Sequence, residues 1–435
     1  MELRELGAPQ SGSEPAPVTS DATSETRARV GAWLSGWRVA LVLLAVLEMA
    51  LALAGAAAGL VGGHEPFAGN WENLIIQGGG PAEQFLSHWQ RWDALWYQHI
   101  AQSGYQAGNG STAFFPLYPM LSRALSVVLA GNVVLAELVL SGVAFAGAMW
   151  LLWKVVARET SGATSLTPAT AAWPGRAMTL PLLTVLLVAL FPSGFFLLGP
   201  FTESLFLLLT LAAFWLSRTG RPWAAGLVGF FASLTRTQGI LLALPLAYEQ
   251  LRQRDSFRWA LRRGGRRPDL ALLASAGPVL GLLVFVAFQA IVLRQSWTGL
   301  NTQEAWGYQL ATPWQAISAS VQYIDTVPNT NSAYVEVLNL VCLLSFTVLT
   351  VAGARRLPLA YTLYALPSLG VLLFRQMYFS PLMSVSRLVL VVFPCFMVGA
   401  MWLAPRPKLA AAWLGVSLLL QLALFQYFVR WGFVA

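Results

Sequence analysis

Asp93 stands at the centre of RWDALWYQHIAQSGY (91–105), a polar and aromatic stretch between two apolar segments. A carboxylate held at a membrane surface among indole rings is partly desolvated and can act as a general base towards a hydroxyl group. The residues alone also allow a structural role, in which Asp93 caps a local turn or pairs with Arg91. The aromatic residues nearest to Asp93 are Trp92, Trp96 and Tyr97.

These aromatic side chains have two interpretations. Interfacial belts gather Trp and Tyr at a membrane surface without any ligand. A sugar-binding site also uses flat apolar faces beside a few polar groups. The sequence leaves both open.

Two arginines interrupt apolar runs, Arg236 in SLTRTQG and Arg387 in SVSRLVLVVFP. An arginine in lipid is costly and usually faces a cavity or a partner, and a phosphate matches the guanidinium geometry. The alternative is snorkelling to the headgroups, which suits Arg375 at a helix end better. Glu203 in GPFTESLF opens another apolar run, either as a helix N-terminal acid or as a site residue.

Other kinds of chemistry find little support. The three histidines, at positions 64, 88 and 99, lack metal-ligand spacing, and no Walker loop or dinucleotide GxGxxG motif is present. Both cysteines lie in apolar runs, as buried space-fillers do. We therefore expect no metal and no other cofactor.

Composition indicates a membrane protein. The chain is 57% hydrophobic and only 11% charged, against about 25% charged in soluble domains. We predict an all-α polytopic fold, with a disordered tail over 1–37 and a transmembrane catalytic domain over 38–435. About eleven spans are expected, a hairpin of two short helices over 223–249 counting as two. The other expected spans are 38–61, 132–153, 178–199, 202–217, 269–293, 333–353, 357–374, 384–403 and 408–428.

The segment 62–112 contains a predicted amphipathic helix from Pro81 to about Ser103, with Gly104 as its C-terminal cap. A shorter interfacial or re-entrant helix is expected over 114–130. Spacings of three and four residues place one set of side chains on a common face of the amphipathic helix. This set is Trp89, Asp93, Trp96, Tyr97 and Ile100.

The distribution of charge predicts the orientation. Most of the 27 Lys and Arg residues fall in loops on one side if the N-terminus is cytoplasmic, as cytoplasmic loops require. Residues 62–130 and 294–332 then form two extracytoplasmic loops, the first containing the active site, in a multi-pass protein of the cell membrane. The net charge of +8 is explained by this asymmetry, so no nucleic-acid partner is expected.

RWDALWYQHIAQSGY (91–105) followed by AFFPLYP (113–119) resembles the signature loop of the PIG-V-like mannosyltransferases. Three later stretches, GPFTESLF, SLTRTQG and SVSRLVLVVFP, resemble later motifs of that family in the same order. The resemblance covers about residues 38–403. Eukaryotic members carry an acid and a histidine where this chain has Leu95 and Trp96, so it looks more like the prokaryotic branch.

The resemblance implies a GT-C type glycosyltransferase that uses a polyprenyl-phosphate sugar, usually mannose, on the extracytoplasmic side. It also implies an essential acid in the first external loop, where Asp93 is the matching position. Our hypothesis is an inverting transfer to a lipid or glycan acceptor, with Asp93 as base. Arg236 and Arg387, with Arg91 as a third candidate, would bind the donor phosphate. The sugar and acceptor would contact Trp92, Trp96, Tyr97, Tyr118 and Glu203.

Two other classes compete with this hypothesis. A polytopic lipid or sugar transporter or flippase would need charges deep in several spans, and the sequence has few. A non-catalytic membrane subunit would need no base at position 93. The expected partners are the lipid-linked donor, the acceptor and membrane lipids, with the oligomeric state left open.

Overall fold

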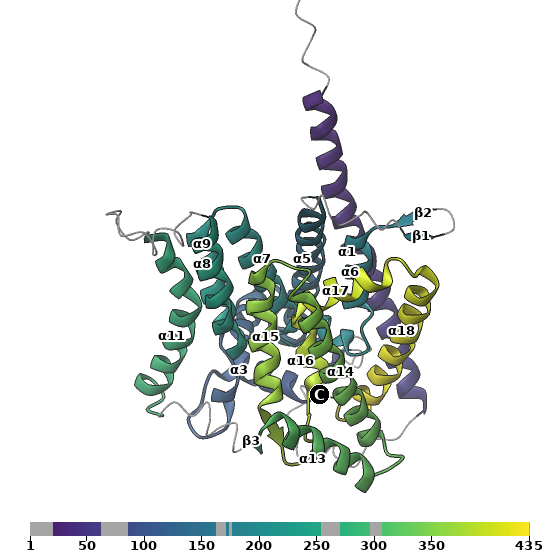
Figure 1. Ribbon diagram of the computed structural model, residues 1–435. Helices are drawn as coiled ribbons and strands as arrows, with labels where there is room; N and C mark the ends of the chain where they lie inside the picture. The colour runs from purple at the N-terminus through teal and green to yellow at the C-terminus, as the bar shows by residue number, and fades with distance from the viewer. Residues whose placement is uncertain are drawn as a thin grey trace, which may run out of the picture.

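The computed structural model describes residues 21–61, 86–161, 171–173, 176–253, 270–295 and 307–434. They form a bundle of α-helices, accompanied in these ranges by two short antiparallel strand pairs (Figure 1). The all-α polytopic fold predicted from composition is confirmed.

Two central helices pack against each other and organise the bundle: α5 (Val133–Ser161) and α7 (Glu203–Arg218). On one side of them lie α1 (Asp21–Val61), α6 (Leu180–Ala189) and α18 (Pro407–Val429). On the other side lie α8 (Pro222–Ser233), α9 (Ala243–Gln253) and α11 (Gly277–Ile291).

A third group packs together and against this frame: α14 (Asn331–Gly353), α15 (Leu359–Leu373) and α17 (Phe393–Leu403). In the lower half of Figure 1 lie α3 (Asp93–Ser103), α13 (Pro313–Thr326) and β3 (Tyr308–Leu310), whereas α1 extends beyond the upper end. β3 pairs with β4 (Arg375–Met377) through Tyr308–Met377 and Leu310–Arg375. α4 (Leu117–Val128) packs on α3 and α5, and β1 (Ala171–Trp173) pairs with β2 (Arg176–Met178).

The predicted count of about eleven spans is too high for full-length helices. Within the described residues, five helices are long and apolar enough to cross a membrane, or six if one bent pair counts as a span. α7, with 16 residues, is only about 24 Å long, against a hydrocarbon core of about 30 Å. Apolar runs overestimated the spans because several of them fold as short helices joined by 3₁₀ turns.

The predicted span 384–403 is one of the apolar runs that do not form a straight helix. It consists of α16 (Val385–Leu388), the 3₁₀ turn Val389–Val391 and α17, with a bend of 86° instead of a straight span. Pro394 lies in the first turn of α17, where its missing N–H costs nothing, and it cannot continue a preceding helix. The bend leaves Arg387 on a short helix of its own.

The predicted amphipathic helix is also shorter than expected. α3 begins at Asp93 because the backbone of Trp92 is left-handed, with φ 54°. Trp89 and Asp93 therefore do not share a helix face, which corrects that prediction. Gly104 does cap the C-terminus of α3, with φ 78°, and the predicted hairpin of two short helices is present as α8 and α9.

Several predictions fall on residues outside the described ranges. These residues include 62–85 of the first predicted loop, with Pro81, and 296–306 of the second predicted loop, 294–332. α1 begins at Asp21, inside the segment 1–37 that composition predicts as a tail. The boundaries of the predicted tail and loops stay predictions.

Candidate active site

Four charged side chains meet where the first turns of α3 and α7 approach α16. Arg387 donates from Nη1 to Asp93 Oδ2 at 2.6 Å and from Nε to Glu203 Oε1 at 2.6 Å. Arg236 Nη1 also donates to Glu203 Oε1. We call these four residues, Asp93, Glu203, Arg236 and Arg387, the Asp93 cluster.

The members of the Asp93 cluster differ in exposure. The Glu203 side chain is fully buried, and those of Arg387 and Arg236 are 5% and 13% exposed. Burying such charges is tolerated because each arginine has an acid and each acid has an arginine. The Asp93 side chain, by contrast, is 36% exposed. The cluster therefore opens to the outside at Asp93.

Local structure explains where these side chains stand. Asp93 and Glu203 are each the first residue of a helix, α3 and α7. Acids are favoured there because the helix N-terminus carries partial positive charge. Arg236 has an extended backbone directly before the 3₁₀ turn Thr237–Leu242, which interrupts the apolar run at this arginine.

The backbone directly before Asp93 is strained. A left-handed conformation is unfavourable for any residue with a side chain, and it persists only where neighbours hold it. Trp92 is held by the end of the chain: its Nε1 donates to the Gly432 carbonyl at 3.3 Å. Its ring meets Trp431 and Phe433 edge to face. Trp92, predicted to contact the sugar, is buried against Trp431 and Phe433 directly before the start of α3.

Arg387 lies over two phenylalanine rings, 4.9 Å from the centroid of Phe196 and 4.7 Å from that of Phe201. Such contacts stabilise a guanidinium electrostatically and orient its plane. Among the described residues, Nη2 of Arg387 and both Nε and Nη2 of Arg236 have no hydrogen-bond acceptor. The cluster thus keeps donors that an anion could occupy.

Arg91 does not join the cluster. Its Nε and Nη2 donate to the Val429 carbonyl at 3.0 and 2.8 Å, and Nη1 donates to the carbonyls of Ser87 and Gln90. Its guanidinium also lies 4.5 Å from the Trp431 ring centroid. With four of its donors used by backbone oxygens, Arg91 fastens the α3 region to the C-terminal segment. The phosphate role suggested for Arg91 finds no support in this geometry.

The structure also shows the positions of three other residues that the sequence predicts to contact the sugar or acceptor. Trp96 stacks on Phe114 at 5.6 Å, and Tyr97 meets Phe114 edge to face at 5.3 Å. Tyr118 is fully buried, and its hydroxyl bonds to Ser141 and to the Glu137 carbonyl. Trp96 is half-buried and lies one turn after Asp93 on α3, so it remains a candidate for ligand contact, whereas Tyr118 is fully buried in the packing.

Tyr97 lies between this packing and the Asp93 cluster. Burial raises the pKa of the Tyr97 phenol, and the nearby Asp93 carboxylate raises it further. The phenol is therefore neutral at physiological pH, and its acidity responds to the charges of the cluster. We therefore assign Tyr97 to the lining of the site and not to proton transfer.

The sequence missed some members of the site. Phe196 and Phe201 face Arg387, and Thr202 Oγ1 accepts a hydrogen bond from Arg236 at 3.3 Å. Phe201 and Thr202 belong to the stretch GPFTESLF, so that motif was the available signal. Glu203 was placed among sugar contacts, but it is buried and instead holds both arginines.

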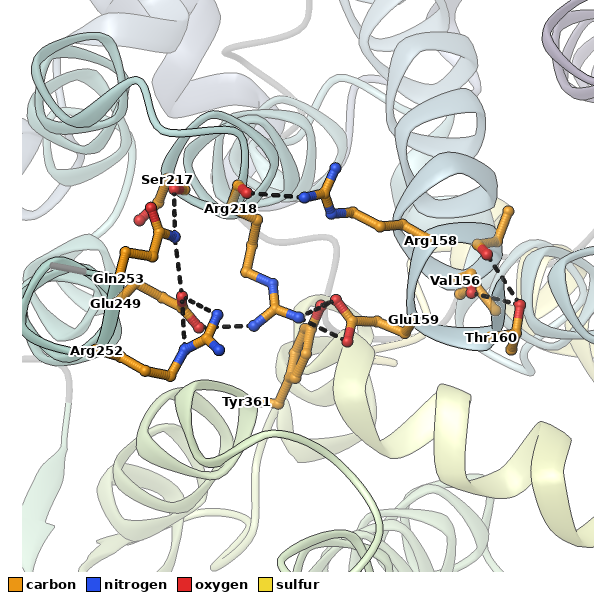
Figure 2. Close-up of polar contacts among 11 residues, drawn as sticks. Val156, Arg158, Glu159, Thr160, Ser217, Arg218, Glu249, Arg252, Gln253 and Tyr361 are labelled. Carbon is orange, nitrogen blue, oxygen red and sulfur yellow. Dashed lines mark hydrogen bonds and ion pairs between the residues drawn. The ribbon is translucent and has the colours of Figure 1, made fainter. Parts of the chain in front are cut away.

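A second charged cluster occupies the opposite end of α7. Arg218, the last residue of that helix, donates to Glu159 on α5 at 2.6 Å and to Glu249 on α9 at 2.8 Å (Figure 2). Arg252 adds bonds to Glu249, and the Tyr361 hydroxyl donates to Glu159 at 3.0 Å. We call Glu159, Arg218, Glu249 and Arg252 the Arg218 cluster. It joins α5, α7, α9 and α15.

No group of three or more His, Cys, Asp or Glu within the described ranges is placed to hold a metal ion. The bundle and the Asp93 cluster define a polytopic membrane protein with an acid–arginine site at one end of its helices. The chain belongs to the mannosyltransferase (PIG-V) family, whose sequence model matches residues 79–351. This confirms the family resemblance seen in the motifs and indicates a glycosyltransferase. Membership of a prokaryotic branch stays a prediction.

Two curated relatives are named GPI alpha-1,6-mannosyltransferase 2. The mouse protein is 27% identical over 214 residues, which cover 48% of this chain and 39% of the relative. The rat protein is 30% identical over 173 residues, which cover 39% of this chain and 33% of the relative. The chain thus aligns with well under half of the length of either relative.

Proposed function

We propose that the protein is a membrane mannosyltransferase of inverting mechanism. It would transfer mannose from a polyprenyl-phosphate donor to a lipid or glycan acceptor on the extracytoplasmic face. The observation that carries the proposal is the partly exposed Asp93, held by the buried Arg387, in a chain of a mannosyltransferase family. The acceptor of this chain is left as a class, because the relatives are aligned over only part of their length.

In the proposed reaction, the acceptor hydroxyl attacks the anomeric carbon of the donor sugar. Arg387 occupies Asp93 Oδ2, and Oδ1 has no partner among the described residues. Oδ1 would therefore take the hydroxyl proton as the new C–O bond forms. The bond between the anomeric carbon and the phosphate oxygen breaks, and its electron pair leaves with the phosphate.

The leaving phosphate gains negative charge, and preorganised donors stabilise such charge strongly in a dry site. The unoccupied donors of Arg387 and Arg236 are suited to this task. Glu203 would position both guanidinium groups from beneath, without contacting the sugar. Trp96 and Tyr97 would form apolar walls for the sugar or acceptor.

The test uses the full chain in right-side-out membrane vesicles, with labelled polyprenyl-phosphate-mannose and a membrane lipid extract added outside. The wild type should form a labelled product there. Asp93→Asn should lower transfer by about 10²–10⁴-fold, the usual contribution of a general base. The matched control is Asp325→Asn, at an exposed aspartate on α13, which should transfer normally.

Near-normal transfer by the Asp93→Asn variant would exclude this residue as the base. A protein that moves the labelled donor across the vesicle membrane unchanged would instead be a transporter. Product formation only after the vesicles are opened would contradict the extracytoplasmic placement of the site.

A further inference from the structure

The segment that carries Arg387 has an unusual backbone. Ser384, three residues before Arg387, is left-handed with φ 66°, although it is not a glycine. Such a conformation is maintained only when the surroundings determine it. The groups that hold residues 380–386 therefore decide where the guanidinium of Arg387 stands.

Helix α14 supplies two of these groups. Glu336 is fully buried, and its Oε2 accepts from the Ser380 hydroxyl at 2.5 Å and its Oε1 from the Leu382 N–H at 2.9 Å. One turn further along α14, Asn339 Oδ1 accepts from the Ser386 N–H at 2.9 Å. These three bonds tie both ends of the 380–386 segment to one face of α14.

Two further side chains complete this support. Ser193 Oγ donates to the Ser386 carbonyl at 2.7 Å, so both backbone groups of Ser386 are engaged. Arg375 Nη2 donates to the Met383 carbonyl at 3.1 Å. The segment is held on either side of the strained Ser384, directly before Arg387.

Glu336 has no ion-pair partner in the part of the chain that the structure describes. A buried carboxyl without a cation is costly unless hydrogen bonds compensate it. Both of its oxygens are engaged by the 380–386 segment. Because Glu336 is buried and bonds to no member of the Asp93 cluster, we expect it to affect the reaction through the residues that it holds.

We propose that Glu336 and Asn339 are positioning residues that set Arg387 between Asp93 and Glu203. The inference rests on the proposed function, because it assigns these residues to the same site. A misplacement of about 1 Å in a catalytic group can lower the rate by about 100-fold. The effect of α14 on the reaction should therefore pass entirely through Arg387.

A double-mutant cycle tests this path, because two residues that act together give non-additive effects. Glu336→Gln keeps the size of the side chain but removes its negative charge and replaces one acceptor oxygen by an amide NH2 group, which cannot accept a hydrogen bond. In the wild-type background it should lower kcat about tenfold. In an Arg387→Lys background the same substitution should lower kcat by less than about twofold. A second tenfold loss would show that Glu336 acts independently of Arg387 and would overturn the proposal.

Ser380→Ala and Asn339→Ala are further variants in case Glu336→Gln does not fold. Ser380→Ala removes one donor to Glu336 and should lower kcat about threefold, again only when Arg387 is present. Asn339→Ala removes the oxygen that accepts from the Ser386 N–H and should lower kcat about threefold under the same condition. Multiplicative losses with Arg387→Lys would contradict the proposal for either variant.

Glu249→Gln in the Arg218 cluster is the matched control for loss of a buried, hydrogen-bonded carboxylate. It should lower the melting temperature without lowering kcat of the folded protein. Failure of the proposed function is recognised separately, by an active Asp93→Asn variant. Inactive Asp93→Asn combined with additive Glu336→Gln and Arg387→Lys effects would refute the positioning role alone.

Discussion

The two ends of α7 carry clusters of the same formal composition, two acids and two arginines each. The Asp93 cluster gathers around Glu203 at the first residue of the helix, and the Arg218 cluster gathers around its last residue. Both bring together segments that are far apart in the chain. Composition and net charge therefore cannot tell them apart.

Their hydrogen bonding differs. In the Arg218 cluster all four carboxylate oxygens of Glu159 and Glu249 accept bonds, from Arg218, Arg252, Gln253 or Tyr361 (Figure 2). In the Asp93 cluster Glu203 Oε2 is buried without a partner among the described residues. One oxygen of Asp93 and donors of both arginines are also left over.

This difference indicates whether a buried charge network serves chemistry or holds helices together. A network in which every carboxylate oxygen accepts a hydrogen bond fastens helices together, since none of its oxygens is left to take a proton. A network with an unoccupied oxygen on a partly exposed acid, beside arginine donors, can bind an anion and accept a proton. We therefore assign chemistry to the Asp93 end and helix fastening to the Arg218 end.

The largest difference is expected from the same substitution at both ends. Arg387→Lys keeps the charge but cannot bridge Asp93 and Glu203 from two separate nitrogens. Mannosyl transfer by the folded protein should fall about 100-fold. Arg218→Lys should lower the melting temperature and leave transfer by the folded protein within about twofold of wild type. For both variants, transfer is measured as the amount of labelled product per amount of monodisperse protein recovered from size-exclusion chromatography.

An equal loss of transfer in the two variants would end the distinction between the clusters. So would an Arg387→Lys variant that differs from wild type only in melting temperature.

The next effect concerns the acids at the two centres. Glu203→Gln leaves two buried guanidinium groups with only Asp93 for compensation. Breaking a buried pair costs about 3–5 kcal/mol of folding free energy, and the displaced arginines should lower transfer about tenfold. Glu249→Gln should also reduce stability, with kcat unchanged. For both variants, stability is measured by thermal unfolding in detergent and kcat by transfer kinetics on the same preparations. A lower kcat for Glu249→Gln would contradict the assignment of the Arg218 cluster to helix fastening.

The smallest effect is expected at Arg91, which borders the Asp93 cluster without belonging to it. Arg91→Lys reduces the number of N–H groups that can donate to the Val429 and Ser87 carbonyls. It changes none of the residues proposed to bind the donor phosphate. Transfer should change by less than about threefold, with an unchanged donor KM. A tenfold rise of the donor KM would return Arg91 to the phosphate-binding residues.

Much of the fold follows from local patterns in the sequence. Apolar runs located the long helices, Gly104 marked the end of α3, and the polar interruption at Arg236 marked the turn between α8 and α9. Local patterns overestimated the spans, because hydrophobicity does not report where a 3₁₀ turn or a proline bends the chain. The 86° bend after α16 is one such case.

The candidate site was predictable only in its parts. The stretch around Asp93 and the isolated arginines 236 and 387 are visible in the sequence, since a charge within an apolar context needs a partner. Their partners are not visible. Arg91 is two residues from Asp93 and was the obvious pair, yet Asp93 bonds to Arg387, 294 residues away.

The sequence by itself determined the class of the protein, its family, its helical elements and the residue types available for chemistry. Tertiary structure alone decided which charges meet, which of them stay buried, and which hydrogen-bonding groups are left unoccupied. The physical reason is that periodicity and composition describe interactions within a few residues along the chain. The pairing of Asp93, Glu203, Arg236 and Arg387 depends on the packing of α3, α7, α8 and α16, and on the support that α14 gives to the segment before Arg387.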